Sequence, residues 1–473
     1  MSKAPAFTST LKGLIWLYLA LLLSEGALRK WIVPGLSNEL LIARDPLVIL
    51  IYIVALSNKR FVVNGFVMLD AFLAIMSFVG GMLSPDSTFI ATLIGLRCYF
   101  LHLPLIFVME RTLDREDVFR MGRLLLWVAV PETLLVVDQF YSPQSALVNF
   151  DVGGNVGVGM PGALDRFRPS GTFSFTTGVS EFYPLALAML LGLLISRKKL
   201  SLPVAIAAGL SILVAVPFSI SRTNFLTCII VLLTALLSML ILPKPPMLVV
   251  RCIVVASALA CILPWLGFFS EGMRVFEARW ADSNSNSVKG FQTSIVERAL
   301  NDIMPPTDYI LNSDSLMGEG VGYGTMMAQA YLTGKRNFAL GESEWPRILL
   351  EMGPILGLIF IGMRVALCGR MLIAGLLALR RDNVLPILIC VDGVLLVLNG
   401  QWGQPTTLGF ATFTAGLTFA AANISAETVT TPVVRARRLV RRWEPPPTRQ
   451  PWQPLGSPLP EPKPRPQLTD SPP

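Results

Sequence analysis

The chain has 473 residues and a formal net charge of +8, with 53% hydrophobic residues and only 15% charged residues. A soluble domain carries about 25% charged residues, so this composition excludes an ordinary soluble domain. The single histidine, His102, excludes histidine-based catalytic triads and multi-histidine metal sites. The sequence also lacks a Walker A motif, so nucleotide hydrolysis by that route is not expected.

Apolar stretches of roughly 20 residues, the length that crosses a bilayer, recur along the whole chain. They predict an all-α polytopic membrane protein with about 12 transmembrane helices. The first stretch lacks a small-residue cleavage site, so it is interpreted as a retained helix and not as a signal peptide. The predicted spans cover residues 11–24, 39–57, 61–83, 88–109, 122–140, 179–196, 200–218, 222–242, 250–269, 345–367, 383–398 and 405–424.

The charges of the short loops alternate, and this alternation predicts the topology. Basic residues gather in loops on every second turn of the chain, at 59–60, 111–123, 197–199, 244–251 and 380–381. The intervening loops 84–87 and 399–402 carry no positive charge. Because cytoplasmic loops carry an excess of lysine and arginine, both termini are expected in the cytoplasm.

Two long loops, 141–178 and 270–344, fall on the outer side, the second of them between the ninth and tenth spans. The second loop has 10 acidic and 6 basic residues, so it is not expected to bind nucleic acid, and its length predicts a folded outer cap. Residues 1–424 are expected to form the membrane domain. Residues 425–473 are expected to form a basic, proline-rich, disordered cytoplasmic tail, which anchors the topology or, alternatively, docks a cytoplasmic partner.

Five arginines lie in or near the outer ends of spans or at the start of the large loop. An ionised arginine at membrane depth is costly and usually faces a polar cavity, and its planar fork of donors fits phosphate oxygens. The arginines therefore predict a diphosphate-binding site. The alternative is that each is a snorkelling or ion-paired structural residue. They are Arg97, Arg168, Arg222, Arg274 and Arg279.

A glycine-rich segment, Gly318–Gly324, and two acids, Glu342 and Glu344, join the large loop to the tenth span. A carboxylate near a low-dielectric boundary can have a raised pKa and act as a general base. These acids could instead cap the following helix or hold a divalent ion. No resident metal or cofactor is expected.

These segments together resemble the O-antigen ligase and polysaccharide polymerase family of bacterial inner membranes. The opening segment Glu25–Trp31 is also similar to part of a polymerase-like subgroup. The family's run that begins His-Asn and ends Glu-x-Gly is matched here by Glu342–Gly353, with Glu342 in place of the histidine and Ser343 in place of the asparagine. The other segments that carry the resemblance are the one around Arg168, Ser219-Ile220-Ser221-Arg222, and Gly318–Gly324.

The resemblance implies inverting, metal-independent glycan transfer from a polyprenyl-diphosphate-linked oligosaccharide at the periplasmic face. The arginines would bind the diphosphate, and Glu342, helped by Glu344, would deprotonate the acceptor hydroxyl. A carboxylate can replace the family's histidine because proton abstraction requires an acceptor near the hydroxyl. Three aromatic residues are expected to stack on the acceptor glycan, or alternatively to anchor at the membrane interface: Trp280, Tyr323 and Trp345.

The absence of the family's histidine at position 342 and the polymerase-like opening segment favour a polymerase of exopolysaccharide or O-antigen repeat units. The alternative is a ligase that uses a lipid or protein acceptor. A flippase or transporter of lipid-linked glycan is the rival from another class, although the chain lacks the long central cytoplasmic link and internal repeat of many transporters. A structural subunit without catalysis is a further alternative. Membrane lipids and polysaccharide export or chain-length proteins are the expected partners.

Overall fold

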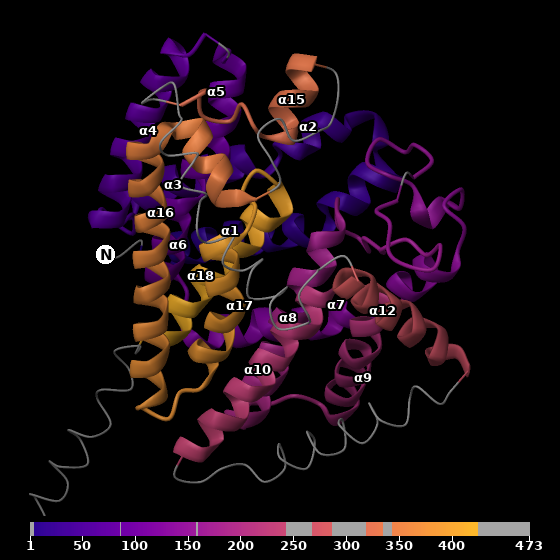
Figure 1. Cartoon of the computed structure of the whole chain (residues 1–473). Helices are drawn as coiled ribbons and strands as arrows, with labels where there is room; N and C mark the ends of the chain where they lie inside the picture. The colour runs from indigo at the N-terminus through magenta and orange to yellow at the C-terminus, as the bar shows by residue number, and fades with distance from the viewer. Residues whose placement is uncertain are drawn as a thin grey trace, which may run out of the picture. The chain divides into compact units, whose positions relative to one another are not determined.

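The computed structural model describes residues 4–85, 87–157, 159–242, 267–285, 318–333 and 343–423. Within these residues the secondary structure is helical, and the only β-type pairing is an isolated bridge between Pro161 and Phe167. The all-α prediction is therefore confirmed for the described part of the chain (Figure 1). Most of the predicted ninth span and Glu342 lie outside the described residues.

The helices follow the apolar stretches closely, and short turns join many of them (Figure 1). The α-helices are α1 (Ala4–Ala27), α2 (Ser37–Leu41), α3 (Arg44–Ser57), α4 (Gly65–Leu83), α5 (Phe89–Leu96), α6 (Leu103–Thr112), α7 (Arg115–Tyr141), α8 (Thr176–Ile195), α9 (Leu202–Phe218), α10 (Arg222–Ile241), α12 (Gly267–Ser285), α15 (Met326–Thr333), α16 (Glu344–Leu379), α17 (Leu385–Asn399) and α18 (Pro405–Ala422). Two π-helices cover Leu28–Ile32 and Arg97–Leu101, and two 3-10 helices cover Pro34–Leu36 and Leu147–Asn149.

Seven helices of the described chain are long and apolar enough to cross a membrane, and the count is eight if the bent pair Pro34–Leu41 and Arg44–Ser57 forms one span. Helices α9 and α17 are apolar but shorter. The outward-facing side chains are themselves apolar: Leu240 is 82% exposed and Leu83 is 68% exposed. Apolar exposure on this scale is unusual for a soluble protein, so the structure supports a membrane-embedded helical protein.

Helices α8 and α18 lie in the interior of the helical packing. Helix α8 contacts α7, α9, α10, α17 and α18, and nearly every residue of α8 and α18 is buried. Helix α18 is rich in threonine, alanine and glycine, and these small residues let neighbouring helices approach closely. Its threonines and Pro405 lower its mean hydropathy, and for this reason α18 is not among the candidate spans. Burial is not the reason, because α8 is a candidate span although 89% of its apolar window is buried.

Three predicted spans are less regular than a single straight helix. The predicted span 88–109 is interrupted by the π-helix Arg97–Leu101, and π-helical turns frequently mark functional or strained positions. The predicted span 39–57 is bent by 41°. Helix α16 extends to Leu379, beyond the predicted end at 367, and is kinked at Gly353, where φ is 75°. The sequence predicts a span from the length of its apolar stretch. A kink or a π-helical turn leaves that length unchanged, so these local breaks were not predicted.

Candidate functional site

Arg168 lies at the end of a short hairpin-like turn in residues 160–168. Its backbone N–H donates to the carbonyl oxygen of Met160 at 2.9 Å. Leu164 and Asp165 turn the chain with φ values of 47° and 58°, and two consecutive positive φ values are typical of a tight hairpin turn. The turn therefore fixes the backbone that leads into Arg168, and the side chain starts from a defined position.

Arg222 is the first residue of α10, and the serines before it form the helix cap. The Ser221 hydroxyl accepts the backbone N–H of Asn224 at 3.3 Å, and the Ser180 hydroxyl donates to Ser221 at 2.8 Å. The Asn224 side chain in turn donates to the Ser219 hydroxyl at 3.1 Å. Serine is a preferred cap residue because its oxygen satisfies a free helix N–H. The two serines of the Ser-x-Ser-Arg segment thus position Arg222.

Helix α12 brings a third arginine, Arg279, to the same place. Its guanidinium donates to the carbonyl oxygen of Gly162 in the hairpin turn at 3.4 Å. The next residue, Trp280, packs against Phe225 of α10 and Phe276 of α12, with ring centroids 5.9 Å apart in both pairs. Trp280 therefore joins α12 to the first turn of α10, directly beside the arginines.

Arg168, Arg222 and Arg279 form an arginine cluster, defined here by their electrostatic interaction. Burial, followed by the charges of Arg279 and Arg222, lowers the pKa of Arg168 to about 10. The Nε atom of Arg168 is buried and has no hydrogen-bond partner among the described residues. Since α10 also directs the positive end of its dipole here, the cluster concentrates positive charge that a bound anion would stabilise.

The arginine cluster lies at the opposite end of its helices from the basic loops. Consecutive helices α8, α9 and α10 alternate in direction, so the start of α10 and the start of α8 share one end. At the other end, Lys198, which follows α8, pairs with Glu116 near the start of α7 at 3.0 Å. The cluster and the loop that contains Lys198 therefore face different sides of the helical packing.

The remaining two predicted arginines are elsewhere. Arg97 forms a largely buried ion pair with Asp45 and donates to the carbonyl oxygen of Leu41 at 2.9 Å, as expected for a structural arginine. Arg274 is exposed on α12, five residues before Arg279 and therefore on a different face of the helix. The structure brings three of the five predicted arginines together.

Glu344, the first residue of α16, is buried within an ion-pair network. It pairs with Arg347, and the Arg364 guanidinium donates to it at 2.9 Å. The backbone N–H of Trp402 adds a further hydrogen bond at 3.2 Å. These partners occupy the carboxylate oxygens, and Glu344, Arg347 and Arg364 side chains have no exposed surface. Glu344 therefore holds α16 against the α17–α18 connection, while Glu342 lies outside the described residues.

Glu351, which ends the family-like run as Glu351-Met352-Gly353 but received no role from the sequence, holds the glycine-rich segment. Its two oxygens accept the backbone N–H groups of Gly322 and Gly324 at 2.8 and 2.9 Å. Gly318, Gly320 and Gly322 all have positive φ values, which only glycine adopts without strain. Successive backbone N–H groups in such a turn form an anion-binding concavity, and here the anion is the protein's own side chain. The signals available in the sequence were the glycines at every second position from 318 to 324 and the Glu-x-Gly ending at 351–353.

The opening segment, whose chemistry the sequence left open, supports the loop that follows Arg168. Lys30 donates to the Ser170 hydroxyl at 2.6 Å and to the carbonyl oxygen of Gly171 at 3.1 Å. Arg29 donates to the Ser174 hydroxyl at 3.0 Å. Both basic side chains are buried. They donate hydrogen bonds to polar groups of the 170–174 loop. The sequence did not predict this contact, because the two segments are about 140 residues apart in the chain.

Substituting Gly26 in α1 with alanine tests this support. A Cβ at Gly26 would overlap the backbone of Phe173 and Ser174, so we expect a loss of about 1–3 kcal/mol of stability and a displaced Arg168. Thermal unfolding and the affinity for geranylgeranyl diphosphate measure the two effects. Gly13→Ala in the same helix is the matched control, because a Cβ there meets no atom within 4 Å. Equal behaviour of the two variants would contradict the supporting role.

The other two predicted glycan-binding aromatics lie near α16 and the glycine-rich segment. Trp345 is 7% exposed and donates its ring N–H to the carbonyl oxygen of Leu398 at 2.8 Å. Tyr323 is half-buried, and its carbonyl oxygen accepts a hydrogen bond from Gln329 at 2.8 Å. Trp280 is thus the one predicted aromatic that the structure places against the helices of the arginine cluster.

No protein-family model matches the chain, and no curated protein is significantly similar to it in sequence. The resemblance to O-antigen ligases and polysaccharide polymerases therefore stays a prediction, supported by short segments and by their order along the chain. The function has to be argued from the site itself.

Proposed function

We propose that this protein is a membrane glycosyltransferase that uses a polyprenyl-diphosphate-linked oligosaccharide as donor and polymerises repeat units of an exopolysaccharide or O-antigen. The observation that carries the proposal is the convergence of Arg168, Arg222 and Arg279 at one end of a membrane-embedded helical protein. Guanidinium forks bind phosphate oxygens in a bidentate manner. A lipid-linked diphosphate would present those oxygens at the membrane surface.

In the proposed reaction, the acceptor hydroxyl oxygen forms a bond to the anomeric carbon of the donor sugar with inversion. The bond between that carbon and the diphosphate oxygen breaks, and the polyprenyl diphosphate leaves with the electron pair. The arginine cluster stabilises the negative charge that develops on the leaving group. The acceptor proton passes to Glu342, since the ion pairs of Glu344 occupy its oxygens.

The proposed topology has twelve spans, both termini in the cytoplasm and the arginine cluster on the periplasmic side of a bacterial inner membrane. It is supported by the basic loops, which the positive-inside rule assigns to the cytoplasm, and by the position of Lys198 at the opposite end from the cluster. A ligase that transfers finished glycan to a lipid or protein is the second candidate, because the same donor site serves both reactions.

Deleting the protein in its host and sizing the surface glycan tests the proposal. We expect loss of long chains and accumulation of single lipid-linked units on the periplasmic side, because a polymerase acts after the units have crossed the membrane. Intact polymer that stays on its carrier lipid would instead identify a ligase. Units trapped on the cytoplasmic side would identify a flippase and would refute glycosyl transfer.

A further inference from the structure

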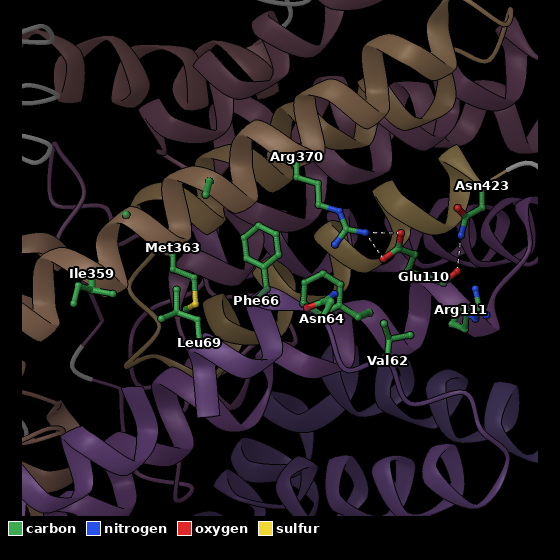
Figure 2. Close-up of a pocket in the computed structure, with 14 residues that line it drawn as sticks. Val62, Asn64, Phe66, Leu69, Glu110, Arg111, Ile359, Met363, Arg370 and Asn423 are labelled. Carbon is green, nitrogen blue, oxygen red and sulfur yellow. Dashed lines mark hydrogen bonds and ion pairs between the residues drawn. The ribbon is translucent and has the colours of Figure 1, made fainter. Parts of the chain in front are cut away.

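A cavity of about 770 Å³ lies between α4, α6 and α16, away from the arginine cluster (Figure 2). Its two ends differ in chemistry. Leu69, Ile359 and Met363 line one end, whereas Arg111, Arg370 and Asn423 line the other. The cavity is therefore amphipathic along its length.

The apolar end follows one face of α16. Ile359, Gly362, Met363, Ala366 and Arg370 line the cavity at spacings of three and four residues, which places them on one side of the helix. The small residues Gly362 and Ala366 leave the groove open, and a Cβ at Gly362 would meet no atom within 4 Å. At a rise of 1.5 Å per residue, the lined face is about 16 Å long, enough for a substantial part of an extended hydrocarbon chain.

The polar end carries an excess of positive charge. Glu110 neutralises Arg370, since Arg370 donates to both oxygens of Glu110 at 2.8 and 2.9 Å. Arg111 is exposed and has no ion-pair partner among the described residues, and Arg60 donates to its backbone carbonyl oxygen at 2.7 Å. The charged lining residues Arg111, Arg370 and Glu110 leave a net charge of +1, and Arg60 beside Arg111 raises it to +2. The 19-residue helix α4, capped by Asn64, adds its positive N-terminal end.

The ion pair of Arg370 also fixes the boundary between the two ends. Its guanidinium lies 5.1 Å from the ring centroid of Phe107 and 4.6 Å from that of Phe419. Such cation–π contacts hold the side chain in place, so Arg370 forms a rigid wall. Arg111 remains the cation that can turn toward a ligand.

We propose that this cavity binds an anionic phospholipid of the leaflet that the basic loops face. One acyl chain lies along Leu69, Gly362 and Ile359, and the headgroup phosphate lies against Arg111 and the start of α4. The charge selects an anionic headgroup over a zwitterionic one, because each arginine near a negative lipid surface contributes attraction of about 1 kcal/mol. The apolar groove retains that lipid longer than lipid on the open helix faces.

The experiment measures binding of dioleoylphosphatidylglycerol to the purified, delipidated full-length protein by native mass spectrometry, with dioleoylphosphatidylcholine as the comparison. We expect preferential retention of phosphatidylglycerol. Arg111→Gln should weaken its binding about fivefold. Gly362→Leu should abolish it, because a side chain at this position enters the groove and its Cβ meets no protein atom within 4 Å. Gly13→Leu is the matched control, since its Cβ also meets no atom within 4 Å and Gly13 does not line the cavity.

Three results would overturn the proposal. Equal retention of the two phospholipids would mean that the protein does not distinguish their headgroups. Retention unchanged by Gly362→Leu would mean that the lipid binds outside this cavity. Displacement of phosphatidylglycerol by a lower concentration of geranylgeranyl phosphate would assign the cavity to a polyprenyl carrier. Unchanged helical content by circular dichroism in each variant ensures that loss of binding reports on the cavity and not on unfolding.

Discussion

Replacing Glu351 with glutamine is expected to destabilise the protein by about 3–5 kcal/mol, the range found when one partner of a buried ionic network is removed. The carboxylate accepts N–H groups from Gly322 and Gly324 on separate oxygens and lies 3.8 Å from the Arg347 guanidinium. A glutamine amide has one acceptor oxygen, and its NH₂ group would face a backbone donor. One glycine N–H would then be buried without a partner, and the positive charge of Arg347 would be less compensated.

Thermal unfolding in detergent, followed by circular dichroism, measures this loss. Glu39→Gln is the control, because Glu39 is exposed and surface substitutions usually change stability by less than about 0.5 kcal/mol. Limited proteolysis gives a second readout, since release of the glycine-rich segment should expose new cleavage sites around residues 318–325. An unfolding temperature equal to that of the Glu39 variant would show that Glu351 does not hold this segment.

Arg222→Lys is expected to lower glycan transfer and donor affinity by roughly tenfold to a hundredfold. Lysine keeps the charge but loses the planar fork, and hydrogen bonds to charged groups contribute about 1.5–3 kcal/mol each. The affinity for geranylgeranyl diphosphate and the rate of chain elongation in membranes are the measurements. Arg274→Lys is the matched control, since Arg274 is exposed on α12 and outside the arginine cluster.

The comparison with Glu342→Ala separates binding from chemistry. If Glu342 is the base, its removal should abolish transfer while leaving diphosphate affinity near the wild-type value. Arg222→Lys should instead affect both. An Arg222 variant with unchanged affinity and activity would reject bidentate diphosphate recognition at that position. A Glu342 variant with normal glycan assembly would favour a structural subunit over an enzyme.

The helices were predictable because an apolar stretch bounded by charges or turn residues determines both their existence and their approximate ends. The start of α10 at Arg222 and the start of α18 at Pro405 match the predicted limits to the residue. The kink at Gly353 and the π-helix at Arg97–Leu101 were not predictable, because they depend on packing against other segments. Hydropathy likewise does not count α18 among the candidate spans, because its threonines lower the average over the helix.

The arginine cluster was predictable in part. Position beside a predicted span identified Arg168 and Arg222, and position at the start of the large loop identified Arg279. The expectation that an arginine at membrane depth faces a polar cavity also selected Arg97, which forms an ion pair with Asp45. A sequence does not reveal which carboxylate from another helix will meet a given arginine. For the same reason, the roles of Glu351 and Lys30 emerged only from the structure, since their partners are 29 and 140 residues away in the chain.

The interior position of α18 has a consequence for how the protein is made. In the proposed topology this helix must enter the bilayer, and its threonines weaken the tendency of its apolar residues to partition there before neighbouring helices are present. Once assembled, it is surrounded by α1, α6, α7, α8, α16 and α17, all of which it contacts. Insertion of the last helix should therefore be coupled to the docking of earlier ones, so membrane integration and tertiary folding are completed in a single late step.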